Sequence, residues 1–98
     1  MMKSKAVNDL AAEVAAKTLN LIDVREADEF ASGHLPGAIN LPLSAFLERY
    51  GELDKDKPYH IICRSGARSA QACAFLEEEG YDVTNVAGGT IAWMGALE

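Results

Sequence analysis

The sequence predicts an α/β fold, a parallel sheet with helices on both faces, and this prediction rests on two observations. First, several short apolar runs lack sustained apolar/polar alternation, which is typical of strands buried on both faces. Second, stretches with helical character separate these runs, and an alternating order of strands and helices implies right-handed crossovers between parallel strands. The expected strands cover residues 19–24, 38–41, 59–63 and 83–87, with a short edge strand at 3–7.

Three of the predicted helices end directly before a glycine, which supplies the left-handed conformation that commonly stops a helix. They cover residues 26–32, 44–50 and 68–79 and are followed by Gly33, Gly51 and Gly80. The third helix carries small and apolar side chains at spacings i, i+3, i+4 and i+7, so that face should pack on the sheet. The residues of this face are Ser69, Ala72, Cys73 and Leu76.

Two further helices are expected near the chain ends. Asn8 is predicted to cap a helix over residues 9–16, because its side-chain oxygen can accept a hydrogen bond from the first turn. After the last strand, two glycines turn the chain into a final helix, whose larger side chains are Ile91, Trp93 and Met94.

Length and charge limit what the protein can be. The chain has 98 residues, which allows one domain, residues 1–98. Apolar residues make up 49% and charged residues 24%, which are the proportions of an ordinary globular protein rather than of a disordered chain or a fibre. Nine Lys and Arg against 15 Asp and Glu give a formal net charge of −6. No broad positive field is present to hold nucleic acid or an anionic membrane, so neither is an expected partner.

Two cysteines, Cys63 and Cys73, are too few for the disulfide framework that small secreted domains need. No Cys and His cluster has the spacing of zinc ligands, so no metal site is expected. Asp9, Glu13 and Lys17 interrupt the alanine-rich N-terminal stretch. It therefore has neither the apolar core of a signal peptide nor the ~20 apolar residues of a membrane span. We expect a cytoplasmic protein.

The segment best suited to catalysis is 63–69, which begins at the end of the predicted strand that closes with Cys63. In an open parallel sheet, ligands bind outside the carboxyl ends of the strands. Gly66 frees the backbone to curl, so that successive N–H groups can point inward, and the following helix adds the positive end of its dipole. With Arg64 and Arg68 nearby, the thiol should ionise more readily than a free cysteine of pKa ~8.5. This gives a nucleophile that needs no histidine base.

The second cysteine receives the opposite interpretation. Cys73 lies about two turns into the helix, roughly 9 Å along the axis from Ala67, which is beyond the ~7 Å that a disulfide can span. We expect Cys73 to belong to the core.

Four segments together resemble the rhodanese-like sulfurtransferases, and the resemblance spans about residues 19–96. They are 21–25 (LIDVR), 33–40 (GHLPGAIN), the Cys63 loop, and Gly88-Gly89 with Ala92-Trp93. The resemblance implies a rhodanese-like fold with a five-stranded parallel sheet. In that family the loop cysteine, here Cys63, carries a persulfide held by backbone amides, and loop arginines help to bind the anionic donor. The substrate-binding residues implied here are Arg64, Ser65, Gly66, Ala67 and Arg68.

Residues outside the loop have weaker indications. For Asp23 and Arg25, the resemblance suggests that they orient the active-site loop or line its mouth, and a structural ion pair is an equal alternative. His34 lies in a turn between a helix and a strand, which favours a structural hydrogen-bonding role over acid or base catalysis. Trp93 is expected in the core or in the wall of a pocket.

Three other classes of function are alternatives to sulfur transfer. Phosphatases and arsenate reductases also place a thiolate in an amide-lined loop, but their C-x5-R spacing requires arginine where this chain has Ser69, and Arg68 comes one position too early. A thioredoxin-like redox role lacks the second cysteine of C-x-x-C. A non-catalytic regulatory module remains an alternative, although such rhodanese-like domains lack the cysteine that is present here.

The sequence therefore predicts a sulfurtransferase that needs no cofactor. A sulfane sulfur would pass from thiosulfate, or a related small-molecule donor, to Cys63 and then to cyanide or a thiol, with a sulfur-relay protein as a further candidate partner. Rhodanese-like enzymes that prefer mercaptopyruvate tend to carry small neutral residues after the cysteine, so Arg64 favours thiosulfate.

Overall fold

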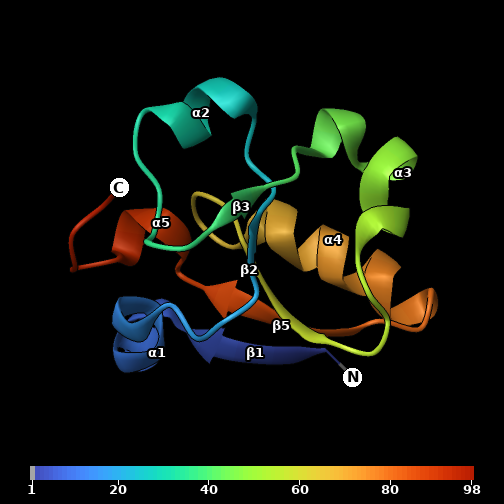
Figure 1. The fold of residues 1–98 in the computed structure, drawn as a ribbon, viewed down its shortest axis with the longest axis horizontal. Coiled ribbons are helices and arrows are strands. Elements are labelled where there is room, and N and C mark those ends of the chain that lie inside the picture. Colours follow the sequence, from blue (N-terminus) through green and yellow to red (C-terminus); the bar gives the residue numbers. More distant parts are fainter. Residues whose placement is uncertain (1) are drawn as a thin grey trace.

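The computed structural model describes residues 2–98 and contains a five-stranded sheet with the order β1-β5-β4-β2-β3. All four neighbouring pairs are parallel, as predicted. The strands are β1 (Lys3–Ala6), β2 (Leu21–Asp23), β3 (Ile39–Asn40), β4 (Pro58–Ile62) and β5 (Asp82–Ala87). The helices are α1 (Ala11–Ala16), α2 (Ala27–Ala31), α3 (Phe46–Arg49), α4 (Ala67–Glu78) and α5 (Gly89–Ala92). Figure 1 shows α3 and α4 on one flank of the molecule and α1 on the opposite flank.

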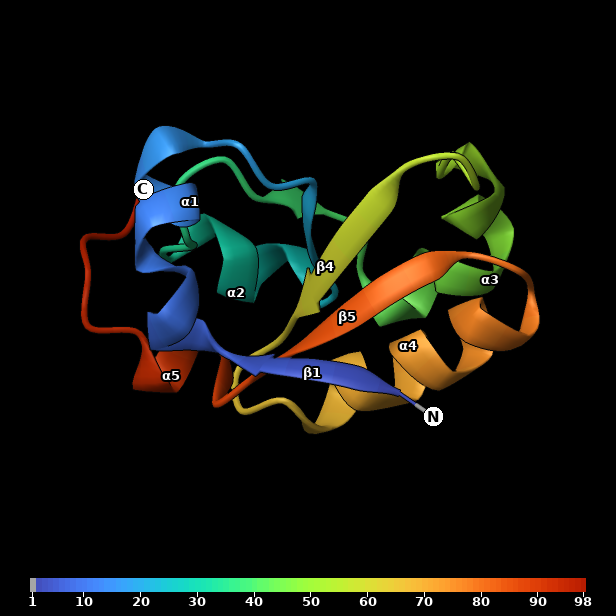
Figure 2. The ribbon, with the colours of Figure 1, turned by 90° about the horizontal axis from the view of Figure 1, so that it is seen from below.

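Two apolar layers stabilise the sheet, one on each face. On one face, α3 and α4 pack against side chains of the central strands, and Cys73 lies fully buried in this layer, as predicted. On the other face, the segment that leads into α1 packs against Leu21, Ile62 and Val86. Figure 2 shows the same separation of α1 from α3 and α4 in a second view. Burial on both faces explains why the strand sequences do not alternate between apolar and polar residues.

The N-terminal helix begins differently from the prediction. Residues Val7–Leu10 form a 3-10 turn before α1, so Asn8 does not cap the helix. The Asn8 side chain instead donates a hydrogen bond to the Ala92 carbonyl at 2.9 Å and accepts one from the Met94 amide at 3.1 Å. This side chain joins the two ends of the chain, a tertiary role that a local capping signal does not reveal.

Two helix ends also differ from the prediction. Gly51 does not have a positive φ, and the chain continues past it in a 3-10 turn over Tyr50–Glu52, so the predicted left-handed stop is wrong. The final helix ends at Ala92, which leaves Trp93 and Met94 outside it. Trp93 packs against the core layer on the α1 face, in agreement with its predicted core role.

The carboxyl ends of β2, β4 and β5 lie together at one edge of the sheet because the strands are parallel. The loop that begins at Cys63 leaves this edge and leads directly into α4. The segments that follow β2 and β5 flank this loop (Figure 1). Among residues 2–98, no helix is long and apolar enough to cross a lipid bilayer.

Candidate active site

Hydrogen-bond donors converge on the sulfur of Cys63. The Gly66 amide lies 3.1 Å from Sγ, the Ser69 amide 3.3 Å and the Ser69 hydroxyl 3.4 Å. Gly66 adopts φ +103°, a left-handed conformation that L side chains rarely take, and this lets the loop curl around the sulfur. The thiol itself is buried, with only 1% of the residue exposed.

These contacts make the Cys63 thiol acidic. Burial raises its pKa, but hydrogen bonds from the Ser69 hydroxyl and from the amides of Ser69, Gly66 and Ser65 outweigh burial and hold the pKa below the ordinary value. Hydrogen bonds to the charged form favour that form. The loop can therefore hold a thiolate, which is the nucleophilic form of cysteine.

The arginines contribute less to this acidity than the sequence suggested. The largest effects that lower the pKa of Cys63 are hydrogen bonds rather than the charges of Arg64 and Arg68. The Arg68 guanidinium is held by Glu29, with Nη1 to Oε1 at 2.7 Å and Nη2 to Oε2 at 3.0 Å. This two-pronged contact lowers the pKa of Glu29 to about 2 and raises the pKa of Arg68. The spacing of Arg68 in the sequence does not reveal that its charge is already neutralised.

Ser69 and Asn85 contribute to the site, although the sequence did not assign them to it. Ser69 is the first of these two residues. It was identified only as part of a packing face and as the residue that replaces the phosphatase arginine. The second is Asn85 in β5, whose Oδ1 accepts a hydrogen bond from the Ser69 hydroxyl at 2.6 Å. Both residues are buried. The Ser69 hydroxyl is thus shared between Cys63 and Asn85, and only the pairing of β4 with β5 brings Asn85 there.

The segment after β5 holds the other side of the loop. The amides of Thr90 and Ile91 donate to the carbonyls of Cys63 and Arg64 at 2.9 and 3.0 Å. Gly89 has φ +62°, and a Cβ at this position would lie 2.4 Å from the Arg64 carbonyl oxygen, so the close approach requires glycine. Because these carbonyls point toward α5, the loop amides that follow can point toward the sulfur. The Gly88-Gly89 pair in the sequence was the signal for this contact.

Asp23 and Arg25 form a buried ion pair at the end of β2. Arg25 Nη2 contacts Asp23 Oδ2 at 2.8 Å and the Gly33 carbonyl at 2.8 Å. The Asn40 amide donates to the carbonyls of both Asp23 and Arg25. The pair ties three segments together, and Arg25 also lines the cavity beside the loop. The structural ion pair, one of the two alternatives that the sequence left open, is present, and a role of the pair toward the active-site loop stays a prediction.

His34 has the structural surroundings that were expected. Its Nδ1 lies 2.9 Å from the Phe30 carbonyl, and its ring stacks on that of Phe30 with the centroids 3.7 Å apart. The other cysteine, Cys73, is buried, and burial raises its pKa to about 12. Within residues 2–98, no group of His, Cys, Asp and Glu side chains is arranged to hold a metal ion.

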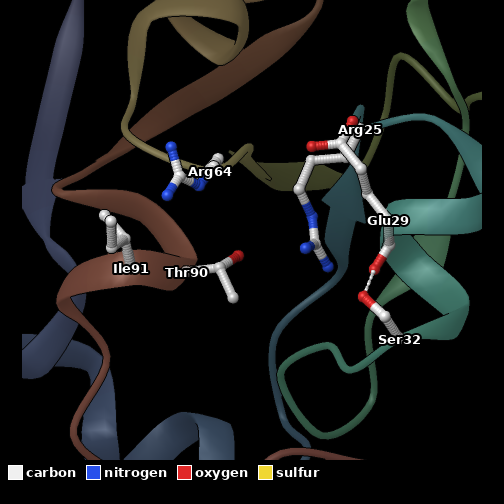
Figure 3. A pocket seen from close by; sticks show the side chains of 6 residues that line it. All are labelled: Arg25, Glu29, Ser32, Arg64, Thr90 and Ile91. Atoms are coloured by element: carbon white, nitrogen blue, oxygen red, sulfur yellow. Dashed lines mark hydrogen bonds between the residues drawn. The ribbon is translucent and has the colours of Figure 1, made fainter.

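A cavity of about 250 Å³ adjoins the loop. Figure 3 shows Arg25 and Arg64 on two different elements on either side of Thr90, with the Arg64 side chain extending away from Arg25, toward the side where Ile91 lies. Cys63 is not in its wall, but Arg64 follows Cys63 directly and Thr90 is bonded to the Cys63 carbonyl. The residues that line the cavity are Arg25, Glu29, Ser32, Arg64, Thr90 and Ile91.

A buried cysteine with a lowered pKa in an amide-lined loop, at the carboxyl edge of a parallel sheet and beside a polar cavity, is the arrangement expected in a class of protein that uses a cysteine nucleophile. The sequence profile of the rhodanese-like domain matches residues 6–96, and the chain belongs to this family. The resemblance stated from the sequence is thus confirmed.

The chain is similar to several named proteins. A sulfurtransferase of Allochromatium vinosum is 49% identical over 74 residues, which are 74% of this chain and 69% of the relative. The thiosulfate sulfurtransferase GlpE of Shewanella oneidensis is 35% identical over 92 residues, 93% of this chain and 91% of that protein. Among solved structures, a rhodanese-like domain protein from Staphylococcus aureus superposes with a TM-score of 0.89 at 35% identity and covers 99% of this chain and 97% of its own.

Proposed function

We propose that this protein is a sulfurtransferase that moves sulfane sulfur from thiosulfate, or a related donor, to cyanide or a thiol through a persulfide on Cys63. The observation that carries the proposal is the convergence of two amides and one hydroxyl on the buried Cys63 sulfur. The family assignment and the relatives named sulfurtransferases support the same chemistry.

The reaction is a double displacement. The Cys63 thiolate attacks the outer sulfur of thiosulfate, a bond forms between Sγ and that sulfur, and the S–S bond of the donor breaks. Its electron pair leaves with sulfite. In the second half, cyanide or a thiolate attacks the outer sulfur of the Cys63 persulfide and releases the Cys63 thiolate, so that the enzyme is regenerated without a cofactor. A protein thiol in a sulfur relay can act as the acceptor by the same step.

The loop supplies the groups for both halves. The amides of Ser65, Gly66 and Ser69 offset negative charge on the sulfur of Cys63. The first amides of α4, beginning at Ala67, have no partner within the helix and add the positive end of its dipole. Arg64 is exposed beside the cavity and is the loop cation placed to meet an anionic donor. Arg68 would assist mainly through its field, because Glu29 occupies its guanidinium.

The test is the intact mass of the protein after incubation with thiosulfate. One added sulfur atom is expected, and cyanide or dithiothreitol should remove it. Cys63→Ser should abolish both the adduct and turnover. Cys73→Ala is the matched control, since Cys73 is buried in the core, and it should keep the adduct with some loss of stability. An adduct that survives Cys63→Ser would overturn the proposal.

The phosphatase alternative differs in what it requires of the loop. A phosphatase needs an arginine six positions after the cysteine, and here Ser69 holds that position with its hydroxyl directed at Sγ and Asn85. We therefore expect background hydrolysis of p-nitrophenyl phosphate. Efficient release of phosphate that depends on Cys63 would favour the hypothesis of a phosphatase over that of a sulfurtransferase.

A further inference from the structure

Thr90 binds the backbone of Cys63 with two donors. Its amide donates a hydrogen bond to the Cys63 carbonyl at 2.9 Å, and its side-chain hydroxyl donates to the same oxygen at 3.2 Å. A carbonyl oxygen has two lone pairs, so Thr90 uses the full accepting capacity of this group. Any residue other than proline could supply the amide at position 90, but the second donor requires a side chain with a hydroxyl.

A hydrogen bond to a carbonyl also fixes the amide of the same peptide group. A trans peptide group is planar, and its C=O and N–H point in opposite directions. Because Thr90 holds the Cys63 carbonyl toward α5, the Arg64 amide points away from α5. The Ile91 amide holds the Arg64 carbonyl in the same way, and the Ser65 amide of that next peptide is one of the groups that lower the pKa of Cys63. Two successive peptide groups of the loop thus take their orientation from α5.

The orientation of these peptide groups matters to a charged sulfur. A peptide that turned its oxygen toward Sγ would place partial negative charge beside the thiolate and oppose ionisation. The Thr90 hydroxyl adds a second contact that resists this rotation. Gly66 and Ser69, whose amides contact Sγ directly, follow these peptides in the chain. The positions of their amides therefore depend on how the first part of the loop is held.

The turn after β5 brings Thr90 to the loop. Gly89 approaches the Arg64 carbonyl closely, and Thr90 follows it directly in the chain. The Thr90 side chain is partly buried and lies in the wall of the cavity beside the loop. Because α5 has only four residues, it acts on the loop through these individual hydrogen bonds rather than through a helix dipole.

We propose that Thr90 is a positioning residue of the Cys63 reaction, and that its hydroxyl holds the peptide between Cys63 and Arg64 in the orientation that favours the thiolate. The inference rests on the proposed function, since it concerns the nucleophile of the same reaction. It differs from the roles of the groups that donate to Sγ, because Thr90 acts through the Cys63 carbonyl.

Thr90→Val tests this role because valine has nearly the shape of threonine and lacks the hydroxyl. The amide remains, and no charged group changes, so the arginines and carboxylates around the loop exert the same field in both proteins. A hydrogen bond between neutral groups is equivalent to a factor of roughly two to ten in an equilibrium constant. The ionisation constant of Cys63 should therefore fall by roughly two- to tenfold, which raises its pKa by up to about one unit.

The measurement is the pH dependence of alkylation of Cys63 by iodoacetamide, with Cys73→Ala in every protein. The midpoint reports the pKa and the plateau reports access to the sulfur, so a less acidic thiol is distinguished from a looser loop. Thr90→Ser restores a hydroxyl and should return the midpoint toward that of the wild type. Thr90→Ala lacks the hydroxyl and should raise the midpoint as Thr90→Val does, so the test does not depend on one variant.

Thr18→Val is the matched control. The Thr18 hydroxyl also donates to a backbone carbonyl, that of Glu13 at 3.4 Å, but it lies just before the start of β2, whereas the loop lies at the carboxyl ends of the strands. This change should leave the midpoint where it is in the wild type.

A wild-type midpoint in both Thr90→Val and Thr90→Ala would overturn the inference. So would a Thr90→Ser variant that shifts as far as Thr90→Val, because the loss of packing rather than of the hydroxyl would then be the cause. An equal shift in Thr18→Val would refute it as well, since a general loss of stability would explain both. Failure of the proposed function looks different, because thiosulfate would then add no sulfur to Cys63 of the wild type.

Discussion

Ser69 is the residue whose removal tests how the loop activates Cys63. Its hydroxyl carries one hydrogen and has three acceptors within reach, namely Cys63 Sγ at 3.4 Å, the Gly66 carbonyl at 3.1 Å and Asn85 Oδ1 at 2.6 Å. When Cys63 ionises, the thiolate becomes the strongest acceptor of the three. Ser69→Ala removes this donor and leaves the amides in place, so the pKa of Cys63 should rise.

The size of the rise follows from the geometry. A hydrogen bond to a charged group contributes ~1.5 to 3 kcal/mol, and one pKa unit equals ~1.36 kcal/mol. The Ser69 hydroxyl is shared with other acceptors, so the lower end of this range applies, and the pKa of Cys63 should rise by about one unit. Asn85 Oδ1 also loses its partner, which should cost about 1 to 3 kcal/mol of unfolding free energy.

The assay is the rate of alkylation by iodoacetamide as a function of pH, in a Cys73→Ala background. Only the thiolate reacts, so the rate rises with pH through the pKa of Cys63 and then levels off. The wild-type midpoint should lie below the ~8.5 of a free cysteine. Asn85→Ala, which removes the closest competing acceptor, should shift the midpoint down while Ser69→Ala shifts it up. An unchanged midpoint in Ser69→Ala, or shifts in the same direction, would show that the amides alone set the acidity.

Two other changes separate binding from loop geometry. Arg64→Ala should lower kcat/KM for thiosulfate by roughly 10- to 150-fold. Arg68→Ala should lower it by less, because the Glu29 carboxylate already holds the Arg68 guanidinium. Equal losses for the two variants in steady-state assays would contradict this account. Gly89→Ala should raise the pKa of Cys63 and lower kcat, since its Cβ would lie 2.4 Å from the Arg64 carbonyl oxygen and the loop must move. Gly51→Ala, where a Cβ meets nothing within 4 Å, is the control and should change neither quantity.

The positions of the strands followed from composition, but their ends did not. The apolar run at 38–41 becomes a strand of only two residues, Ile39–Asn40, at the edge of the sheet. Ile39 is 65% exposed despite its apolar side chain. Asn8 has the local pattern of a helix cap, yet it bonds to groups 84 and 86 residues away. Contacts of this length leave no periodic signal in the sequence.

Contacts between residues far apart in the chain also explain which parts of the site the sequence did not reveal. Cys63 and Gly66 are close in the chain and follow a strand, so their spacing predicted a loop around the sulfur. Asn85 lies in a neighbouring strand, and its contact with Ser69 depends on the register that pairs Ile61 with Asn85. Ser69 itself has a spacing that suits helix packing, which made its second contact, with the sulfur, invisible to the pattern.

Charge is where proximity in the sequence misleads most. Arg64 and Arg68 lie in one short segment and look equivalent, but Glu29, 39 residues from Arg68, pairs with only one of them. The two arginines therefore have different roles. Arg64 is exposed beside the cavity, whereas Arg68 holds α2 against the start of α4 through Glu29. Of the two arginines, only Arg64 therefore carries a charge without an ion pair among residues 2–98.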